Sequence, residues 1–290
     1  MSTSTPVVQI DGLTKQFKDK LALQEVNLRV TEGTVFGFLG PNGAGKTTTI
    51  RILLGLAAAS GGSARIFGQD VATASSDVRR QIGYLPDVPG FYPWMTAAQF
   101  LRLTGKLFGL DEAVITERID ALLAMAGLTG VEHRIGGFSR GMKQRLGIAQ
   151  ALMNAPRLLI LDEPTSALDP VGRKEVLDMI GMLRGRTTVL FSTHILGDAQ
   201  RVCDEVAILQ AGRVVTQAPL HELLAAAGPR RLSVEATGSD EARERFAAAL
   251  PQLAAQTGVE LGPVEQAEAS LEDVFLDLLD TPSPTTGEVR

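Results

Sequence analysis

The residues best suited to chemistry lie at positions 40–47, which read Gly-Pro-Asn-Gly-Ala-Gly-Lys-Thr. They fit the phosphate-binding pattern G-x-x-x-x-G-K-[ST] at every position. Glycines allow a tight turn whose backbone N–H groups cradle phosphate oxygens. Lys46 can reach β- and γ-phosphates, and Thr47 offers a hydroxyl to Mg²⁺. A glycine-rich turn without a ligand is the alternative, but the strand-like run 35–39 and the helical run 47–56 favour a phosphate loop.

Two carboxylates, Asp162 and Glu163, directly follow an apolar strand-like run at 158–161. Asp162 can orient Mg²⁺, directly or through water. Glu163 can polarise a water molecule for in-line attack on the γ-phosphorus. Taken alone, the pair could also be solvated acids at the end of a buried strand. Its combination with a phosphate loop favours the metal and catalytic interpretation.

Two further polar residues stand at the ends of expected elements. Ser139 opens a helix, where its hydroxyl and the backbone N–H groups make a second anion site. Because one site suffices for the chain's own nucleotide, the second can serve a nucleotide on another subunit. His194 follows a strand and can contact a γ-phosphate. The alternatives are an ordinary serine cap and a histidine satisfied by local structure, which is how we interpret His133 and His221.

The elements that must position these residues alternate between strands and helices. This order predicts a mainly parallel sheet flanked by helices, with ligands beyond the carboxyl ends of the strands. Residues 7–10 and 23–30 resemble edge strands. A helical insert is expected where Thr96 caps a helix through Phe108 and Asp111 caps a second that ends at Gly127. Further strands are expected at 82–85, 158–161, 188–191, 206–209 and 214–215.

Composition excludes several classes of protein. The 290 residues carry a net charge of −5, which does not indicate a nucleic-acid binder. Cys203 is the only cysteine, so no disulfide framework or cysteine zinc site is expected. We see no signal peptide and no stretch of about 20 apolar residues that would span a bilayer. These features predict a cytoplasmic protein, and any membrane-spanning part would belong to another chain.

Charge divides the chain into two parts. Residues 1–230 carry a net charge of +3, whereas residues 231–290 carry −8. We therefore expect an α/β domain at 1–228, with a helical subdomain at about 88–155, and a small acidic α+β domain at 229–280. In the second domain, 231–236 is strand-like, 241–250 is helix-like, and Ser270 can cap a helix through Leu279. Residues 281–290 are expected to be disordered.

The ordered set of motifs resembles the ATP-binding subunit of an ATP-binding cassette (ABC) transporter. The set comprises the phosphate loop, Gly-Tyr-Leu-Pro-Asp at 83–87, the Ser139 helix start, Asp162-Glu163, Ser-Ala-Leu-Asp at 166–169, and His194. The resemblance covers about residues 7–225. Ser-Leu-Glu-Asp-Val-Phe at 270–275 resembles the tail of ABC-2-type exporter ATPases, which include drug- and antibiotic-resistance exporters related to the daunorubicin group.

The resemblance implies a P-loop NTPase fold with a mainly parallel core, an antiparallel β edge and an α-helical subdomain. It implies that Phe17 stacks on adenine, although a core phenylalanine is the alternative. Ser139 and Gly141 match the signature motif, which contacts ATP on the opposite subunit. Asp162 and Glu163 match Walker B and the catalytic base, and His194 matches the switch histidine. The Walker A motif is matched by Gly40, Pro41, Asn42, Gly43, Ala44, Gly45, Lys46, Thr47 and Thr48.

The signature segment and position 87 depart from the family pattern. The usual signature is Leu-Ser-Gly-Gly-Gln, and here Phe138, Arg140 and Met142 differ from it while Ser139 and Gly141 are kept. Asp87 stands where the family has Gln or Glu, and its side chain is shorter by one methylene, which reduces its direct reach to Mg²⁺ or to the attacking water. Phe91, Tyr92 and Trp94 follow at once. Because aromatic residues gather at interface cores, they predict a docking segment for a membrane subunit, with packing inside the insert as the alternative.

The implied activity is ATP hydrolysis with ATP and Mg²⁺ as cofactors. The implied assembly is a homodimer, or a heterodimer with a second ABC ATPase, on an integral membrane permease at the inner face of the cell membrane. Closure of that dimer would power export. The alternative is a soluble or regulatory ABC ATPase that is not coupled to transport. The sequence does not identify the transported substrate.

Overall fold

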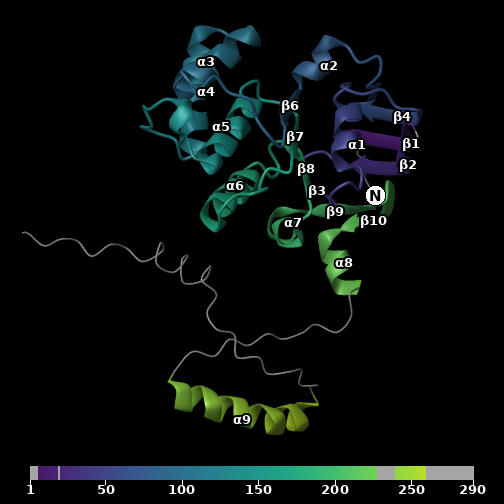
Figure 1. Cartoon of the computed structure of the whole chain (residues 1–290), viewed down its shortest axis with the longest axis vertical. Helices are drawn as coiled ribbons and strands as arrows, with labels where there is room; N and C mark the ends of the chain where they lie inside the picture. The colour runs from purple at the N-terminus through teal and green to yellow at the C-terminus, as the bar shows by residue number, and fades with distance from the viewer. Residues whose placement is uncertain (1–5, 19, 227–238, 259–290) are drawn as a thin grey trace, which may run out of the picture. The chain divides into compact units, whose positions relative to one another are not determined.

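The computed structural model describes residues 6–18, 20–226 and 239–258. The chain divides into two compact units, Met1–Ala226 and Ala227–Arg290. The strands and helices of the first unit alternate along the chain as the sequence predicts (Figure 1). Its strands are β1 (Val8–Phe17), β2 (Lys20–Val30), β3 (Val35–Leu39), β4 (Gly61–Ile66), β5 (Gln69–Asp70), β6 (Ile82–Leu85), β7 (Leu158–Asp162), β8 (Thr188–Thr193), β9 (Glu205–Gln210) and β10 (Arg213–Pro219).

Two sheets make up the first unit. The larger has the strand order β10-β9-β3-β8-β7-β6, and all neighbours are parallel except β9 and β10. The smaller is antiparallel, with the order β2-β1-β4-β5. The prediction that residues 7–10 form an edge strand is wrong, because Val8 pairs with Val30 on one side and with Ile66 on the other. Strand β4 pairs with the side of β1 that does not pair with β2, so β1 lies inside the sheet.

Of the two helix caps predicted for the helical insert, only the first makes a side-chain hydrogen bond. Thr96 and Gln99 form a reciprocal capping box at the start of α3. Asp111 precedes α4 but makes no side-chain cap hydrogen bond, so that part of the expectation is wrong. The helices are α1 (Lys46–Leu53), α2 (Ser76–Arg80), α3 (Ala97–Leu107), α4 (Glu112–Met125), the 3₁₀ turn η1 (Ile135–Gly137), α5 (Arg140–Leu152), α6 (Pro170–Met182), α7 (Leu196–Val202) and α8 (Leu220–Ala226).

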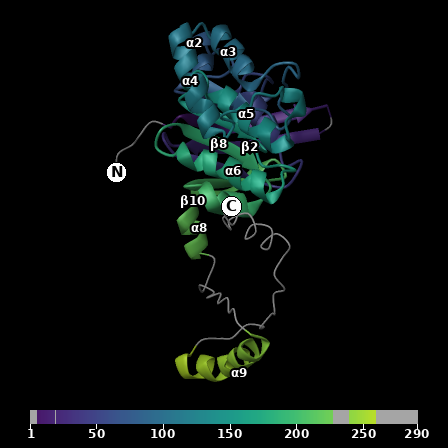
Figure 2. The ribbon, with the colours of Figure 1, turned by 90° about the vertical axis from the view of Figure 1, so that its left-hand side faces the viewer.

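Alternate residues of the central strands face two separate cores. Phe36 and Phe38 of β3 point toward the antiparallel sheet and α1, where they pack with Ile50. Val35 and Leu39 point the other way, into a core shared with α3 to α6. Buried side chains thus line both faces of the sheet, as expected for a parallel sheet covered on each side. Helices α3, α4 and α5 group together at the end of the unit opposite α8 (Figure 2).

The described part of the second unit holds one helix, α9 (Asp240–Thr257). Ser239 caps it by accepting a hydrogen bond from the backbone N–H of Ala242. The predicted helix at 241–250 is confirmed, but α9 continues through Pro251 and ends at Gly258, whose φ of 72° is left-handed. The expectations for 231–236, 270–279 and 281–290 lie outside the described residues.

Candidate active site

The phosphate loop connects β3 to α1 and depends on glycine at two contacts. A Cβ on Gly40 would lie 2.2 Å from the carbonyl oxygen of Leu209. A Cβ on Gly45, whose φ is +114°, would lie 2.6 Å from Leu23 Cδ2 and 3.0 Å from the carbonyl oxygen of Ala22. Both glycines therefore let the loop pack against β2 and β9 while α1 begins at Lys46.

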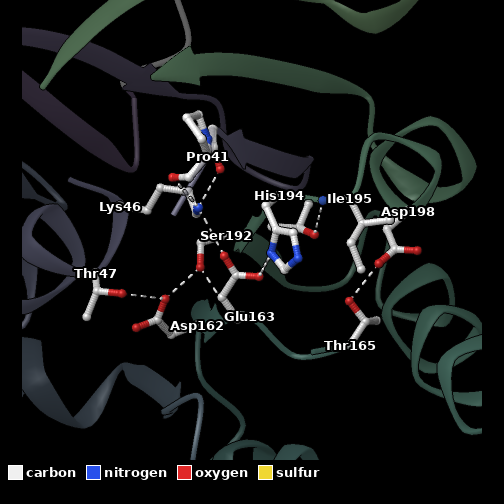
Figure 3. A network of polar contacts seen from close by, with 12 residues as sticks. Pro41, Lys46, Thr47, Asp162, Glu163, Thr165, Ser192, His194, Ile195 and Asp198 are labelled. Atoms are coloured by element: carbon white, nitrogen blue, oxygen red, sulfur yellow. Dashed lines mark hydrogen bonds and ion pairs between the residues drawn. The ribbon is translucent and has the colours of Figure 1, made fainter. Parts of the chain in front are cut away.

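Lys46 is the cation at the centre of the site. Its side chain is only 5% exposed, and its Nζ donates to the carbonyl oxygens of Gly40 at 2.5 Å and Pro41 at 3.2 Å. The same Nζ lies 3.0 Å from Oε1 of Glu163 (Figure 3). A buried ammonium needs such partners, because removing it from water is costly. The fold thus holds Lys46 between the loop backbone and the carboxylate that follows β7.

Asp162 ends β7 as a buried carboxylate between two hydroxyl donors. Its Oδ1 accepts from Ser192 Oγ at 2.6 Å and from Thr47 Oγ1 at 3.2 Å (Figure 3). Desolvation raises the pKa of Asp162 above its usual value, and the charges of Glu163 and Asp87 act in the same direction. The hydrogen bonds from Ser192 and Thr47 lower that pKa and so favour the ionised form.

Glu163 and His194 meet because parallel strands β7 and β8 are neighbours that end at the same edge. Nδ1 of His194 lies 2.8 Å from Oε2 of Glu163. A carboxylate only accepts, so Nδ1 carries the donated proton in this contact. The backbone of Glu163 is left-handed at φ 49°, and its N–H donates to Oγ of Ser192 at 3.0 Å. Ser192 therefore holds the carboxylate of Asp162 and the backbone of Glu163.

A pocket of about 500 Å³ collects most of the predicted residues. The predicted residues that line it come from the phosphate loop, the β1–β2 hairpin and the ends of the parallel strands. They are Phe17, Asn42, Gly43, Gly45, Lys46, Thr47, Thr48, Asp87, Glu163 and His194. Lys20, Ala22 and Ser166 line the pocket as well, although no sequence pattern predicted that they would. Lys20 pairs with Phe17 across the hairpin, which is the one feature that could have pointed to it.

The remaining predicted residues lie outside that lining. Gly40, Pro41 and Ala44 form the loop backbone, and Asp162 sits behind Thr47. Ser139 and Gly141 begin α5, where Oγ of Ser139 accepts from the backbone N–H of Met142 at 3.2 Å. Their predicted contact is with a nucleotide on another subunit. It stays a prediction.

Thr47 and Asp162 are suited to Mg²⁺. Both present oxygen atoms, 3.2 Å apart, beside the phosphate loop. Among the described residues, no cluster of three or more His, Cys, Asp or Glu side chains is placed to hold a metal ion. That finding is compatible with Mg²⁺, which keeps several waters and takes one or two protein ligands together with substrate phosphates. The donor set therefore fits a metal that arrives with its nucleotide.

Together, the loop between β3 and α1 and the carboxylates after β7 define a P-loop nucleoside triphosphatase. Residues 23–166 match the family described as ABC transporter. The chain is 47% identical over 218 residues to the uncharacterized ABC transporter ATP-binding protein YxlF of Bacillus subtilis (strain 168), covering 75% of this chain and 72% of the relative. The chain belongs to this family as an ATP-binding subunit, and its activity is ATP hydrolysis.

Two further comparisons add detail. The chain is 40% identical over 220 residues to the bacitracin transport ATP-binding protein BcrA of Bacillus licheniformis, covering 75% and 71% of the two chains. It also resembles the dimeric, post-hydrolysis structure of the ATP-binding cassette MJ0796 bound to ADP and Pi. That likeness has a TM-score of 0.66 and 27% identity, and it covers 73% of this chain and 98% of the other. In the part of our chain that the structure describes, no helix is both long and apolar enough to cross a membrane.

Proposed function

We propose that the chain hydrolyses MgATP at the interface of two cassettes and thereby powers export through a separate membrane permease. The observation that carries the proposal is the continuous contact from Lys46 through Glu163 to His194, at 3.0 and 2.8 Å, inside the pocket beside the phosphate loop. A cation, a carboxylate and an imidazole are thereby aligned where a γ-phosphate would lie. These are the groups that in-line attack by water requires.

Each residue of this contact has a distinct part in hydrolysis. Phosphate oxygens compete with Oε1 of Glu163 for the ammonium of Lys46, which releases that oxygen to accept a proton from the attacking water. His194 holds the other oxygen of Glu163 through Nδ1, and its Nε2 can meet the γ-phosphate. Phe17, which is 48% exposed on β1, offers a ring face to adenine.

Mg²⁺ would be held by Thr47 and Asp162, and Asp87 lines the same pocket as Thr47. The ion would neutralise charge on the β- and γ-phosphate oxygens. Ser192 keeps Asp162 oriented, because its hydroxyl donates to Oδ1 at 2.6 Å. Asp87 is one methylene shorter than Glu, so we assign it a contact through water.

The dimer is supported by the placement of the two anion-binding devices. One phosphate loop and one signature segment in each chain suit an isologous two-fold pair, in which Ser139 and Gly141 complete the site of the partner. The related cassette that resembles this chain is itself dimeric. A homodimer and a heterodimer with a second ABC ATPase use the same geometry. We assign the contacts of this dimer to the 1–228 domain.

Export is supported by the bacitracin transport relative and by the tail motif at 270–275. We therefore assign the chain to the ABC-2-type, daunorubicin-like exporter branch. The permease partner would place it on the inner face of the cell membrane. Its substrate class would follow from the permease partner.

The aromatic segment after β6 offers a docking surface for that permease. Trp94 is 61% exposed and Tyr92 is 46% exposed, and their ring centroids lie 5.2 Å apart. Phe91 instead packs inward against Phe100 at 5.1 Å, so the docking prediction applies only to the other two. The segment is held in place because the carbonyl oxygen of Met95 accepts from the backbone N–H of Ile135 at 2.9 Å.

Substitution of Glu163 tests the proposed function. Glu163→Gln keeps the shape of the side chain but cannot take a proton, so we expect normal ATP binding, almost no hydrolysis and tighter dimerisation with ATP. Glu32→Gln removes an exposed carboxylate that pairs with Arg157 at 2.8 Å, and neither residue lines the pocket, so this variant is the matched control. Near-normal turnover of Glu163→Gln would rule out its assigned role.

A further inference from the structure

Asp198 is a buried carboxylate that the hydrolysis mechanism does not use. It lies on α7, is 1% exposed, and uses both oxygens as acceptors. Oδ2 accepts from Oγ1 of Thr165 at 2.6 Å, and Oδ1 accepts from Nε of Arg173 at 2.5 Å (Figure 3 shows the first of these contacts). Thr165 is also only 1% exposed. A buried charge with charge-assisted bonds on both oxygens is strongly held in one geometry.

The partners of Asp198 belong to the segments that surround the active site. α7 begins two residues after His194, and Thr165 lies two residues after Glu163. The segments 163–169 and 193–198 are therefore joined twice, by His194 with Glu163 at the pocket and by Asp198 with Thr165 inside the unit. These two contacts tie the position of His194 to the loop that follows Glu163.

That loop needs external support to keep its shape. Glu163 and Ala167 are both left-handed, with φ values of 49° and 52°, although neither is glycine. Such residues cost free energy and persist where surrounding contacts hold them. Thr165 lies midway between them, and its bond to Asp198 is the buried side-chain contact that fixes the loop from within.

The third segment leads from Asp198 to the start of α5. Arg173 lies in the first turn of α6, directly after Gly172. A Cβ on Gly172 would lie 3.7 Å from Cα of Gly141, so the two glycine backbones pack face to face. α6 therefore contacts α7 through Arg173 and the signature segment through Gly172.

We propose that Asp198 is a positioning residue that aligns the 163–169 loop and the Gly141 segment with the nucleotide held by the same chain. The inference rests on the proposed dimer, in which Gly141 meets the partner's nucleotide. Through Thr165 and Arg173, Asp198 makes the position of one chain's signature segment depend on His194 and Glu163 of that chain. The two nucleotide sites of a dimer are thereby coupled, since each chain carries half of both.

Two substitutions test this role in the full chain. Asp198→Asn keeps the shape but removes the charge that holds Arg173, and Thr165→Val removes one donor while keeping the Asp198–Arg173 pair. Both are made in the Glu163→Gln background for dimerisation and in the native background for turnover. MgATP affinity is measured at a protein concentration where the chain is monomeric, dimerisation by light scattering, and folding by thermal unfolding.

We expect the ATP concentration needed for dimerisation to rise, and turnover to fall, by about tenfold or more with Asp198→Asn, from the loss of a charge-assisted bond. MgATP affinity of the monomer should stay within about twofold, because the residue does not line the pocket. If Asp198 only stabilised the fold, Asp198→Asn would not weaken dimerisation and turnover while leaving the MgATP affinity of the monomer unchanged.

Arg201→Gln is the matched control. Arg201 on α7 pairs with Asp178 on α6 at 2.9 Å, so it joins the same two helices, but both side chains are about half exposed and the 163–169 loop is not involved. It should change dimerisation by no more than about twofold.

The outcomes separate the inference from the proposed function. In one outcome, the Glu163→Gln parent dimerises with MgATP while the added Asp198→Asn or Thr165→Val substitution leaves dimerisation and turnover unchanged. That result refutes the positioning role alone. Loss of MgATP binding by the monomer also refutes it, because the residues would then support the pocket itself. If Asp198→Asn does not fold, Thr165→Val decides. A Glu163→Gln parent that stays monomeric with MgATP refutes the proposed function, and the inference with it.

Discussion

Replacing Ser192 by alanine should weaken both the fold and the use of Mg²⁺. Its hydroxyl is fully buried, donates to Oδ1 of Asp162 at 2.6 Å and accepts from the N–H of Glu163 at 3.0 Å. A hydrogen bond to a charged group contributes roughly 1.5–3 kcal/mol. Each orphaned group keeps one other partner, Thr47 Oγ1 for Asp162 and the carbonyl oxygen of Ser192 for the N–H of Glu163, both at 3.2 Å.

We therefore expect Ser192→Ala to lower the free energy of unfolding by about 2 kcal/mol, near the middle of that range. For a unit of this size the loss corresponds to a fall in Tm of about 4–8 °C. Half-saturating Mg²⁺ for turnover should rise by about tenfold, because a ligand that loses its supporting hydrogen bond is less well oriented. Thermal unfolding and Mg²⁺ titrations of ATPase rate measure the two effects.

Thr188→Val is the matched control on the same strand. Oγ1 of Thr188 accepts from the backbone N–H of Gly33 at 3.0 Å, and Thr188 is buried at the opposite end of β8 from His194. Its loss should cost about 1 kcal/mol, as for a neutral hydrogen bond, and leave the Mg²⁺ requirement unchanged. If Ser192→Ala has the same half-saturating Mg²⁺ concentration and the same free energy of unfolding as Thr188→Val, the supporting role assigned to Ser192 is refuted.

Three further predictions concern the site and the docking surface. Lys46→Ala should lose nucleotide affinity in a binding titration, and unchanged affinity would contradict the phosphate-loop assignment. Burial raises the pKa of Asp162, so its contribution to stability is fully present at low pH and is lost as pH rises through that raised pKa. Asp162→Asn should therefore stabilise the nucleotide-free chain more at neutral than at acidic pH, while abolishing Mg²⁺-dependent turnover; an equal shift at both pH values would refute the burial argument. Trp94→Ala should uncouple ATP hydrolysis from transport in the complex with the permease, with little change in Tm because the side chain is 61% exposed; retained coupling would exclude docking there.

Local patterns were sufficient for most elements of the first unit. Thr96 and Gln99 lie three residues apart, as a capping box requires, and α3 begins there. β3 and β6 coincide with their predicted residues because short apolar runs between turns leave few other conformations. The helix α9 was predicted to stop before Pro251 but continues past it, since a proline weakens a helix locally without always ending it.

The candidate site was predictable where one short segment carries the chemistry. Residues 40–47 predicted phosphate binding because the residues that form the loop are contiguous in the sequence. The pocket brings Lys46, Glu163 and His194 together as expected. The supports were missed because their partners lie far along the chain. Ser192 reaches Asp162 across 30 residues, and Asp198 reaches Thr165 across 33. No local spacing encodes such a contact.

The sequence by itself determined the class of protein, since two short segments, the glycine loop with Lys46 at 40–47 and the carboxylates at 162–163, each encode a part of nucleotide chemistry. Only the tertiary structure decided which residues support that chemistry. Strands β7 and β8 pair in parallel, and this pairing places Ser192 between Asp162 and Glu163 and brings His194 beside the latter. The physical reason is that strand order and register depend on burial of both sheet faces throughout the unit, which no single segment specifies.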